Sequence, residues 1–373
     1  MKKVVKKGLV EMGFDMGGGL INWFPGHMAA ASRAIRDRLK LADLVVEVRD
    51  SRVPLSSANE DLQRLLSGKR RVIALNKKDL ANPNIMHKWM HYFESRQQDC
   101  LSINAHSQSS VRKLLDLVEL KLMEVISREP TLLVMVVGVP NVGKSALINS
   151  IRRISSSSFP VQDKIKRAKV GPLPGVTQDI AGYKIAHQPS IYVLDTPGVL
   201  VPSIPNIETG LKLALAGCVK DSVVGEERIA RFLLAILNSR ETPRHWKHLS
   251  GSKTELPATD TEGNCEYSLK SLLPKRKKPP NSCDVHYIEG LVTDVQHALC
   301  AAFLEFTGHI EDGNDMEILI EKQLEALKIA LKIPHMASEA RTMVSKKLLT
   351  LFRTGKLGPF ILDDVPEICR PTW

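Results

Sequence analysis

The stretch GVPNVGKS, residues 138–145, matches the phosphate-binding pattern G-x-x-x-x-G-K-[ST]. It follows the apolar run 132–138, which is typical of a buried strand, and precedes residues 146–153, which are typical of a helix. In such a loop the backbone N–H groups close around phosphates, Lys144 neutralises phosphate oxygens, and Ser145 can ligate Mg²⁺. The residues expected to contact a nucleotide here are Asn141, Val142, Gly143, Lys144, Ser145 and Ala146.

Two further motifs downstream fit the same phosphate chemistry. YVLDTPG, residues 192–198, places Asp195 at a strand end, where it can hold Mg²⁺ through water, and Gly198, whose N–H can sense a γ-phosphate. GPLPGVTQD, residues 171–179, supplies Thr177 in a loop between the two motifs. A threonine that closes on Mg²⁺ only when the γ-phosphate is present would act as a switch.

The base-reading motif lies upstream, in Asn-Lys-Lys-Asp at residues 76–79. Asp79 can accept two hydrogen bonds from the Watson–Crick edge of guanine, whereas adenine would leave it partly unpaired at a cost of about 1–3 kcal/mol. Lys77 can lie over the base, and Asn76 can fix the loop. SINAHS, residues 102–107, offers a second base loop with Asn104 and the backbone of Ala105. The sequence therefore predicts GTP and GDP as ligands and disfavours an ATP-using kinase.

The order of these motifs is unusual, because both base loops precede the phosphate loop and the two switch motifs. Such an order indicates a circular permutation, with the former ends of the chain joined through residues 127–131. A short join of this kind costs little loop-closure entropy and leaves the pairing of the sheet unchanged.

Alternating strands and helices in the first half predict an α/β fold with a mostly parallel sheet covered by helices on both faces. From residue 203 onward the pattern is helical without strands. We expect a leader at 1–22, a permuted GTPase domain at 23–202 and a helical domain at 203–373, with a disordered insertion at 249–283. The expected strands are 42–50, 70–76, 100–105, 132–138 and 190–195.

The formal net charge of +11 favours a polyanionic partner such as RNA. No apolar run approaches the ~20 residues that a membrane-spanning helix needs, so no transmembrane segment is predicted, and a peripheral membrane contact stays open. The six cysteines are scattered, which argues against a disulfide framework. The basic N-terminal stretch is atypical of an organelle presequence because it lacks arginine.

Several motifs together resemble the circularly permuted DAR GTPases of ribosome assembly. They are NWFPGHM at 22–28, VRDSRVPLSS at 48–57, NKKD, GVPNVGKS, GPLPGVT, DTPG and the tail FRTGKLGPF. The resemblance covers nearly the whole chain except the insertion. It implies GTP hydrolysis, a partnership with the large ribosomal subunit and its rRNA, and a mitochondrial location in the matrix. Inner-membrane association stays open, as do plastid and cytosol as alternative compartments, and we expect a monomer.

The resemblance also suggests how hydrolysis is helped. Val199 stands where small GTPases usually carry a water-orienting glutamine, so hydrolysis should be slow alone and stimulated by K⁺ and the subunit. Asn141 resembles an asparagine that ligates K⁺ beside the phosphates, and His27 resembles a histidine proposed to act near the nucleophile. A structural role for His27 stays open.

Two positions depart from the family pattern. The Asp-Ala-Arg motif reads Asp50-Ser51-Arg52, and Asn104 replaces the usual serine of the second base loop. Two other classes of function remain: a GTP-binding scaffold that hydrolyses negligibly, which Val199 would suit, and a tRNA-modifying GTPase, for which no modification motif is visible.

Overall fold

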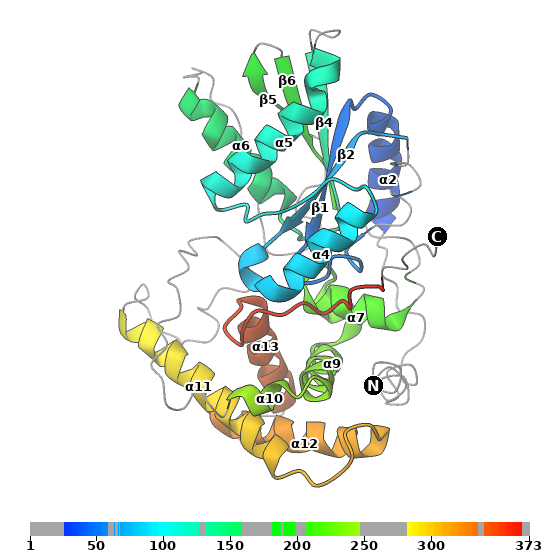
Figure 1. Ribbon diagram of the computed structural model, residues 1–373. Helices are drawn as coiled ribbons and strands as arrows, with labels where there is room; N and C mark the ends of the chain where they lie inside the picture. Colours follow the sequence, from blue (N-terminus) through cyan, green and yellow to red (C-terminus); the bar gives the residue numbers. More distant parts are fainter. Residues whose placement is uncertain are drawn as a thin grey trace. The chain divides into compact units, whose positions relative to one another are not determined.

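The computed structural model describes residues 26–58, 63, 66, 68–126, 131–158, 181–187, 190–198, 204, 206–246, 282–334 and 339–367. These residues form two compact units (Figure 1). A nucleotide-binding unit contains the described residues up to Lys220 together with those from Pro359 onward, and a helical unit contains those from Asp221 to Gly358. In the described part of the chain, no helix has both the length and the apolar character to cross a membrane.

The nucleotide-binding unit is built on a six-stranded sheet with the order β3-β2-β1-β4-β6-β5. In this spatial order the first five strands (β3, β2, β1, β4 and β6) are parallel to their neighbours, as predicted. Strand β5 runs antiparallel to β6 at one edge of the sheet. The sequence did not predict β5, because Gly182, Lys184 and His187 interrupt its apolar pattern. The strands are β1 (Leu44–Asp50), β2 (Arg71–Asn76), β3 (Cys100–Ser102), β4 (Thr131–Val137), β5 (Ala181–His187) and β6 (Ser190–Asp195).

The central strand β1 sets the register of the motifs. All of its residues are buried, as its run of branched apolar side chains between two neighbouring strands requires. Asp50 pairs with Asn76 of β2, and Val136 of β4 pairs with Asp195 of β6. Because parallel strands end at one edge of the sheet, the base motif, the phosphate loop and Asp195 meet at that edge.

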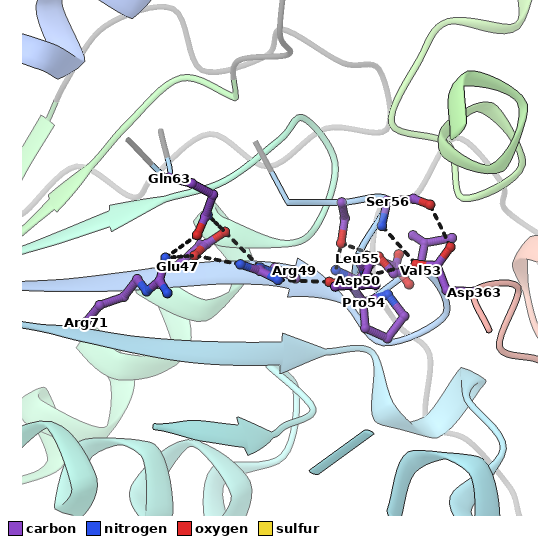
Figure 2. Close-up of polar contacts among 11 residues, drawn as sticks. Glu47, Arg49, Asp50, Val53, Pro54, Leu55, Ser56, Gln63, Arg71 and Asp363 are labelled. Carbon is purple, nitrogen blue, oxygen red and sulfur yellow. Dashed lines mark hydrogen bonds and ion pairs between the residues drawn. The ribbon is translucent and has the colours of Figure 1, made fainter. Parts of the chain in front are cut away.

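A buried charged pair interrupts the apolar pattern of β1 (Figure 2). Glu47 and Arg49 lie on the same face of the strand, and Arg49 Nε donates to Glu47 Oε1 at 2.8 Å. Arg71 and Gln63 also donate to the Glu47 carboxylate. Burial alone would raise the pKa of Glu47, but Arg49 and these donors outweigh it and lower the pKa. Arg49 also donates to the Pro54 carbonyl at 3.1 Å, which fixes the loop after β1.

Helices pack around this sheet, and in Figure 1 α4 and α5 run in front of the strands. Helix α4 begins where Asn82 caps it, by accepting hydrogen bonds from the N–H groups of Asn84 and Ile85. Its apolar face buries Trp89 and Phe93. The helices of this unit are α2 (Gly26–Leu39), the 3-10 turn η1 (Lys78–Leu80), α4 (Pro83–Ser95), α5 (Gln108–Ile126), α6 (Lys144–Ser158) and α7 (Ile207–Leu215).

The helical unit has no strand among its described residues, as the sequence predicted. Helix α9 carries the buried Asn238, whose amide exchanges hydrogen bonds of 2.9 and 2.8 Å with Gln323 of α12. Arg353 of α13 donates to Asp221 of α8 at 2.6 and 2.8 Å, which ties the two ends of the unit together. The helices are α8 (Asp221–Val224), α9 (Glu226–Ser239), α10 (Thr242–His245), α11 (Ser282–Leu304), α12 (Gly313–Ala330) and α13 (Ala340–Arg353).

The division between the units falls after Lys220, not at residue 203 as the sequence suggested. The reason is that α7 and the turn after it pack within the nucleotide-binding unit, where Gly217 accepts a hydrogen bond from Asn141. The leader at 1–22 lies outside the described residues, as does the insertion at 249–283 up to residue 281. Helix α11 begins at Ser282.

Candidate functional site

The phosphate loop between β4 and α6 depends on two glycines in the left-handed region. Gly138 has φ 150°, and a Cβ there would lie 2.3 Å from the Val48 carbonyl oxygen. Gly143 has φ 95°, and a Cβ there would lie 2.3 Å from Asn76 Nδ2. Only glycine fits either position. The loop ends where α6 begins at Lys144, and the N-terminus of a helix favours an anion.

Lys144 occupies the centre of this loop. Its Nζ donates to the carbonyl oxygens of Gly138 at 3.1 Å and Val139 at 2.9 Å. Burial lowers the pKa of Lys144 to about 8, although Asp195 opposes the shift. Phosphate oxygens would supply the negative charge that the two carbonyls only partly replace. Lys144 therefore suits the neutralising role predicted for it.

Ser145 and Asp195 form a pair suited to Mg²⁺. Ser145 Oγ donates to Asp195 Oδ2 at 3.0 Å, while Asp195 Oδ1 is buried and has no hydrogen-bond partner among the described residues. Burial raises the pKa of Asp195, although Lys144 and hydrogen bonds from Ser145 and Thr196 oppose it. A divalent cation would reverse that shift and satisfy the unpartnered oxygen. The donor set therefore fits the expected ion.

Gly198, at the end of the motif at residues 192–198, lies directly against the phosphate loop. A Cβ on Gly198 would meet Pro140 Cα at 2.4 Å and Lys144 Nζ at 3.0 Å. Thr196 Oγ1 anchors the preceding turn by donating to the Val136 carbonyl at 2.7 Å. Gly198 therefore lies where its backbone can respond to a phosphate held by Lys144, and the predicted contact stays a prediction.

The base loop is fastened to the phosphate loop by two side chains. Asn76 Nδ2 donates to the Val142 carbonyl at 2.8 Å, and Asn76 Oδ1 accepts from the Ala105 N–H at 2.9 Å. Lys77, with φ 62°, donates from Nζ to the Asn141 carbonyl at 2.8 Å. The structure thus brings together loops that are far apart in the chain, in the arrangement that a permuted order requires.

The residues expected to touch guanine lie beside this junction. Asp79 is exposed in η1, so its carboxylate is accessible to a ligand. The Ala105 N–H, expected to meet the guanine oxygen, instead donates to Asn76. Asn104 Oδ1 accepts from the His106 N–H at 2.8 Å, so its side chain stabilises the loop. Direct guanine contacts by Asp79, Asn104 and Ala105 stay predictions.

The sequence reasoning did not place four residues at this site: Asp50, Arg52, Ala216 and Gly217. Asn141 Nδ2 donates to the Gly217 carbonyl at 3.0 Å, and Arg52 donates to the neighbouring Ala216 carbonyl at 3.1 Å. The end of α7 therefore lies at the phosphate loop. Asp50 is also present, since its Oδ2 lies 2.9 Å from Lys77 Nζ. The Asp-Ser-Arg motif could have suggested Asp50 and Arg52, but no sequence signal marks Ala216 or Gly217.

Three candidates cannot be placed. Thr177 and Val199 lie outside the described residues, and the side chain of His27 is likewise not described, although its backbone belongs to α2. Their roles in the switch and in hydrolysis stay predictions.

Comparison with known proteins decides the family. The family model of the 50S ribosome-binding GTPases matches residues 133–255. "Short integuments 2, mitochondrial" of Arabidopsis thaliana is 69% identical over 368 residues, which cover 98% of this chain and 95% of that protein. "DAR GTPase 2, mitochondrial" of the same plant is 38% identical over 353 residues, which cover 93% of this chain and 92% of that protein. This chain is a circularly permuted DAR GTPase.

A further relative supports the same family. "Mitochondrial ribosome-associated GTPase 1" of Mus musculus is 40% identical over 232 residues, which cover 60% of this chain and 68% of that protein. All three relatives are named as mitochondrial, and this GTPase is a mitochondrial protein. Membership of this family confirms two predictions: the fold, and the binding and hydrolysis of GTP.

The lowered pKa of Lys144 predicts that this DAR GTPase takes up protons when it binds nucleotide at alkaline pH. The free ammonium begins to lose its proton near pH 8, whereas bound phosphates stabilise the charged form and raise the pKa. GDP affinity should therefore fall as pH rises above about 8. Calorimetry in buffers of different ionisation enthalpy, without added Mg²⁺, should report more proton uptake at pH 9 than at pH 7.5. Equal uptake at both values would contradict the shift.

Proposed function

We propose that this GTPase is an assembly factor for the large ribosomal subunit of mitochondria. In this proposal a monomer in the matrix binds the immature subunit and its rRNA in the GTP form, and hydrolysis releases it. The description of the matching family as 50S ribosome-binding supports the partner, as does the name of the ribosome-associated relative. The net charge of +11 supports contact with RNA.

The observation that carries the release mechanism is the hydrogen bond from Asn141 to Gly217. Asn141 belongs to the phosphate loop, and Gly217 lies in the turn that leads through Lys220 into the helical unit. A change in the phosphates would act on Asn141 and hence on the segment at which the helical unit begins. In this proposal the nucleotide state reaches the helical unit through the turn after α7, which is hydrogen-bonded to the phosphate loop. A direct connection from Gly198 to the helical unit is therefore not required.

Hydrolysis in this proposal relies on charge placed around the phosphates. Lys144 neutralises their oxygens, while Ser145 and Asp195 would hold Mg²⁺, with Thr177 joining them in the GTP form. The Asn141 amide would hold K⁺, a cation that supplies positive charge beside the phosphates. Donation from Nδ2 to Gly217 fixes the amide in one orientation, which supports its use as a ligand. We assign His27 to a position near the attacking water when the subunit is bound.

Association with ribosomal particles tests the proposal. The full-length protein, bound either to a non-hydrolysable GTP analogue or to GDP, is sedimented with mitochondrial large subunits over a salt series. We expect about tenfold or stronger association in the analogue-bound form, with binding that weakens steeply as salt rises. Equal association in both nucleotide states would refute the release mechanism, and association with small subunits alone would refute the partner.

The alternative is a GTP-dependent scaffold that does not use hydrolysis, and Val199 motivates it. Turnover measured with and without large subunits, in K⁺ and in Na⁺, separates the two. The assembly-factor proposal expects turnover to rise by at least about a hundredfold with subunits and K⁺ together. Turnover that stays at the basal rate under all conditions would favour the scaffold.

A further inference from the structure

The loop that follows β1, residues 50–57, is joined to the base loop at its first residues. We call it the Asp50 loop. The Ser51 N–H donates to the Asn76 carbonyl at 2.8 Å, and Asp50 Oδ2 lies 2.9 Å from Lys77 Nζ. The same Nζ donates to the Asn141 carbonyl of the phosphate loop. Lys77 is thus held between a carboxylate on one side and the phosphate loop on the other.

Asp50 is a permanent anion in this position. Its side chain is fully buried, and Arg52 donates to Oδ1 at 3.0 Å and to Oδ2 at 2.8 Å. Burial alone would raise the pKa of Asp50, but Arg52 and Lys77 outweigh it and hold the pKa well below its usual range. A charged, buried carboxylate with fixed geometry restrains Lys77 more strongly than a neutral acceptor would.

The opposite side of the Asp50 loop is held by residues from the C-terminal end of the chain (Figure 2). Asp363 Oδ2 accepts from the N–H groups of Leu55 and Ser56, each at 2.8 Å, and Oδ1 accepts from Ser56 Oγ at 2.6 Å. The Leu362 N–H donates to the Arg52 carbonyl at 2.7 Å. Asp363 is only 5% exposed, and Lys212 of α7 lies 3.6 Å from it. These contacts fix the loop from Arg52 to Ser56.

The same C-terminal residues also reach the base loop. The Phe360 N–H donates to the Leu80 carbonyl at 3.1 Å, next to Asp79. Ile361 is buried in the cluster formed by β2 and α4, which contains Ile73 and Trp89. We call residues 360–363 the C-terminal brace. It connects the base loop to the Asp50 loop.

We propose that Asp363 is a positioning residue of the nucleotide site, which acts through the Asp50 loop on Lys77. When the brace is in place, Asp50 holds Lys77 against Asn141, and the base loop and phosphate loop stay closed around the ligand. When the brace is lost, the Asp50 loop relaxes, Lys77 loses its restraint, and nucleotide dissociates faster. The inference needs guanine-nucleotide binding by this site and is independent of the proposed ribosomal partner.

The position of the brace in the chain gives it a regulatory consequence. The chain leaves the nucleotide-binding unit at Lys220 and re-enters it at Pro359, immediately before the brace. A partner that pulls on the end of the helical unit would act on Asp363 through the chain. Release of nucleotide would then be controlled at the C-terminal connection.

The first test is the Asp363→Ala variant of the full chain, with dissociation of a fluorescent methylanthraniloyl-GDP followed by stopped flow. We expect dissociation about tenfold faster than in the unsubstituted protein, because two backbone donors of the Asp50 loop lose their acceptor. Glu367→Ala is the matched control, since it removes an exposed carboxylate from the same segment. It should leave the rate within about twofold. An unchanged rate for Asp363→Ala would overturn the proposal.

A double-substitution cycle with Lys77→Met distinguishes positioning from general loosening of the fold. If Asp363 acts through Lys77, adding Asp363→Ala to Lys77→Met should change the dissociation rate by less than about twofold. Full acceleration in the Lys77→Met background would mean that the brace acts by another route, and the proposal would fail. If Asp363→Ala does not fold, the cycle is run with Asp363→Asn, which keeps the shape but not the charge; about threefold acceleration is expected.

Discussion

Replacing Lys144 by methionine should reduce the affinity for GTP and GDP by at least about a hundredfold. The ammonium is buried at the centre of the phosphate loop, where it donates to Gly138 and Val139. On binding, phosphate oxygens would replace these acceptors in charge-assisted hydrogen bonds, which contribute about 1.5–3 kcal/mol each. Methionine has a similar volume but no charge and no donor. Equilibrium titration with a fluorescent GDP measures the loss.

The same substitution should change the stability of the nucleotide-free protein little. Losing the two hydrogen bonds from Lys144 to backbone carbonyls should lower the free energy of unfolding. Removing a buried ammonium, whose pKa burial has lowered, should raise it, so the two effects oppose each other. Chemical unfolding without nucleotide checks this, and Lys88→Met, at an exposed lysine of α4, is the control for both measurements. If the Lys144→Met variant binds GDP with unchanged affinity, Lys144 does not contribute to nucleotide binding.

Replacing Asp79 by asparagine should exchange the preference for guanine with a preference for xanthine. In the predicted contact the carboxylate would accept from the N1–H and the 2-amino group of guanine, whereas an amide offers one acceptor and one donor. The amide donor would face the 2-amino group of guanine but would match the 2-carbonyl of xanthine. One mismatched polar pair costs about 1–3 kcal/mol, and the loss of a charged acceptor adds to it, so GTP should bind at least about a hundredfold more weakly.

Competition of GTP, XTP and ATP against a fluorescent GDP or XDP measures this exchange. XTP should bind the Asp79→Asn variant more tightly than it binds the unsubstituted protein. Asp116→Asn is the control, because it also removes one negative charge, at an exposed position of α5. It should leave the preference for guanine unchanged. If the Asp79→Asn variant still selects guanine, the base is read by other residues, and the assignment of η1 to base reading is wrong.

The chemistry of the site could be predicted from the sequence because each part of it is a short, contiguous motif at a strand end. The loop from Gly138 to Ser145 encodes its own φ values through glycine and its own charge through Lys144. Residues 76–79 likewise carry their polar and charged groups in one short stretch, although Lys77 reaches φ 62° without being glycine. Hydrophobic runs predicted the five parallel strands, and the order of the nucleotide-binding motifs in the chain predicted the permutation. These features depend on local backbone geometry and on burial, both of which leave a pattern in neighbouring residues.

The structure divides into compact units after Lys220 and revealed how the loops are connected. Helix α7 has the same apolar helical pattern as the helices of the helical unit, so periodicity could not assign it to the nucleotide-binding unit. Strand β5 was missed because an edge strand needs no continuous apolar run. The hydrogen bonds from Asn141 to Gly217 and from Leu55 to Asp363 join residues separated by 76 and 308 positions.

The sequence by itself determined which nucleotide chemistry this protein can perform. The glycines and Lys144 of the phosphate loop, and the base motif at residues 76–79, each lie within a stretch of a few residues. Only the tertiary structure decided what holds Lys77 and Asn141 in place. Asp50, Gly217 and Asp363 reach the site through contacts between distant segments. Such contacts depend on how the sheet and helices bring backbone carbonyls and N–H groups together, and backbone groups are the same in every residue. A sequence pattern therefore cannot mark Gly217 or Asp363 as partners, whereas the Asp-Ser-Arg motif could have marked Asp50.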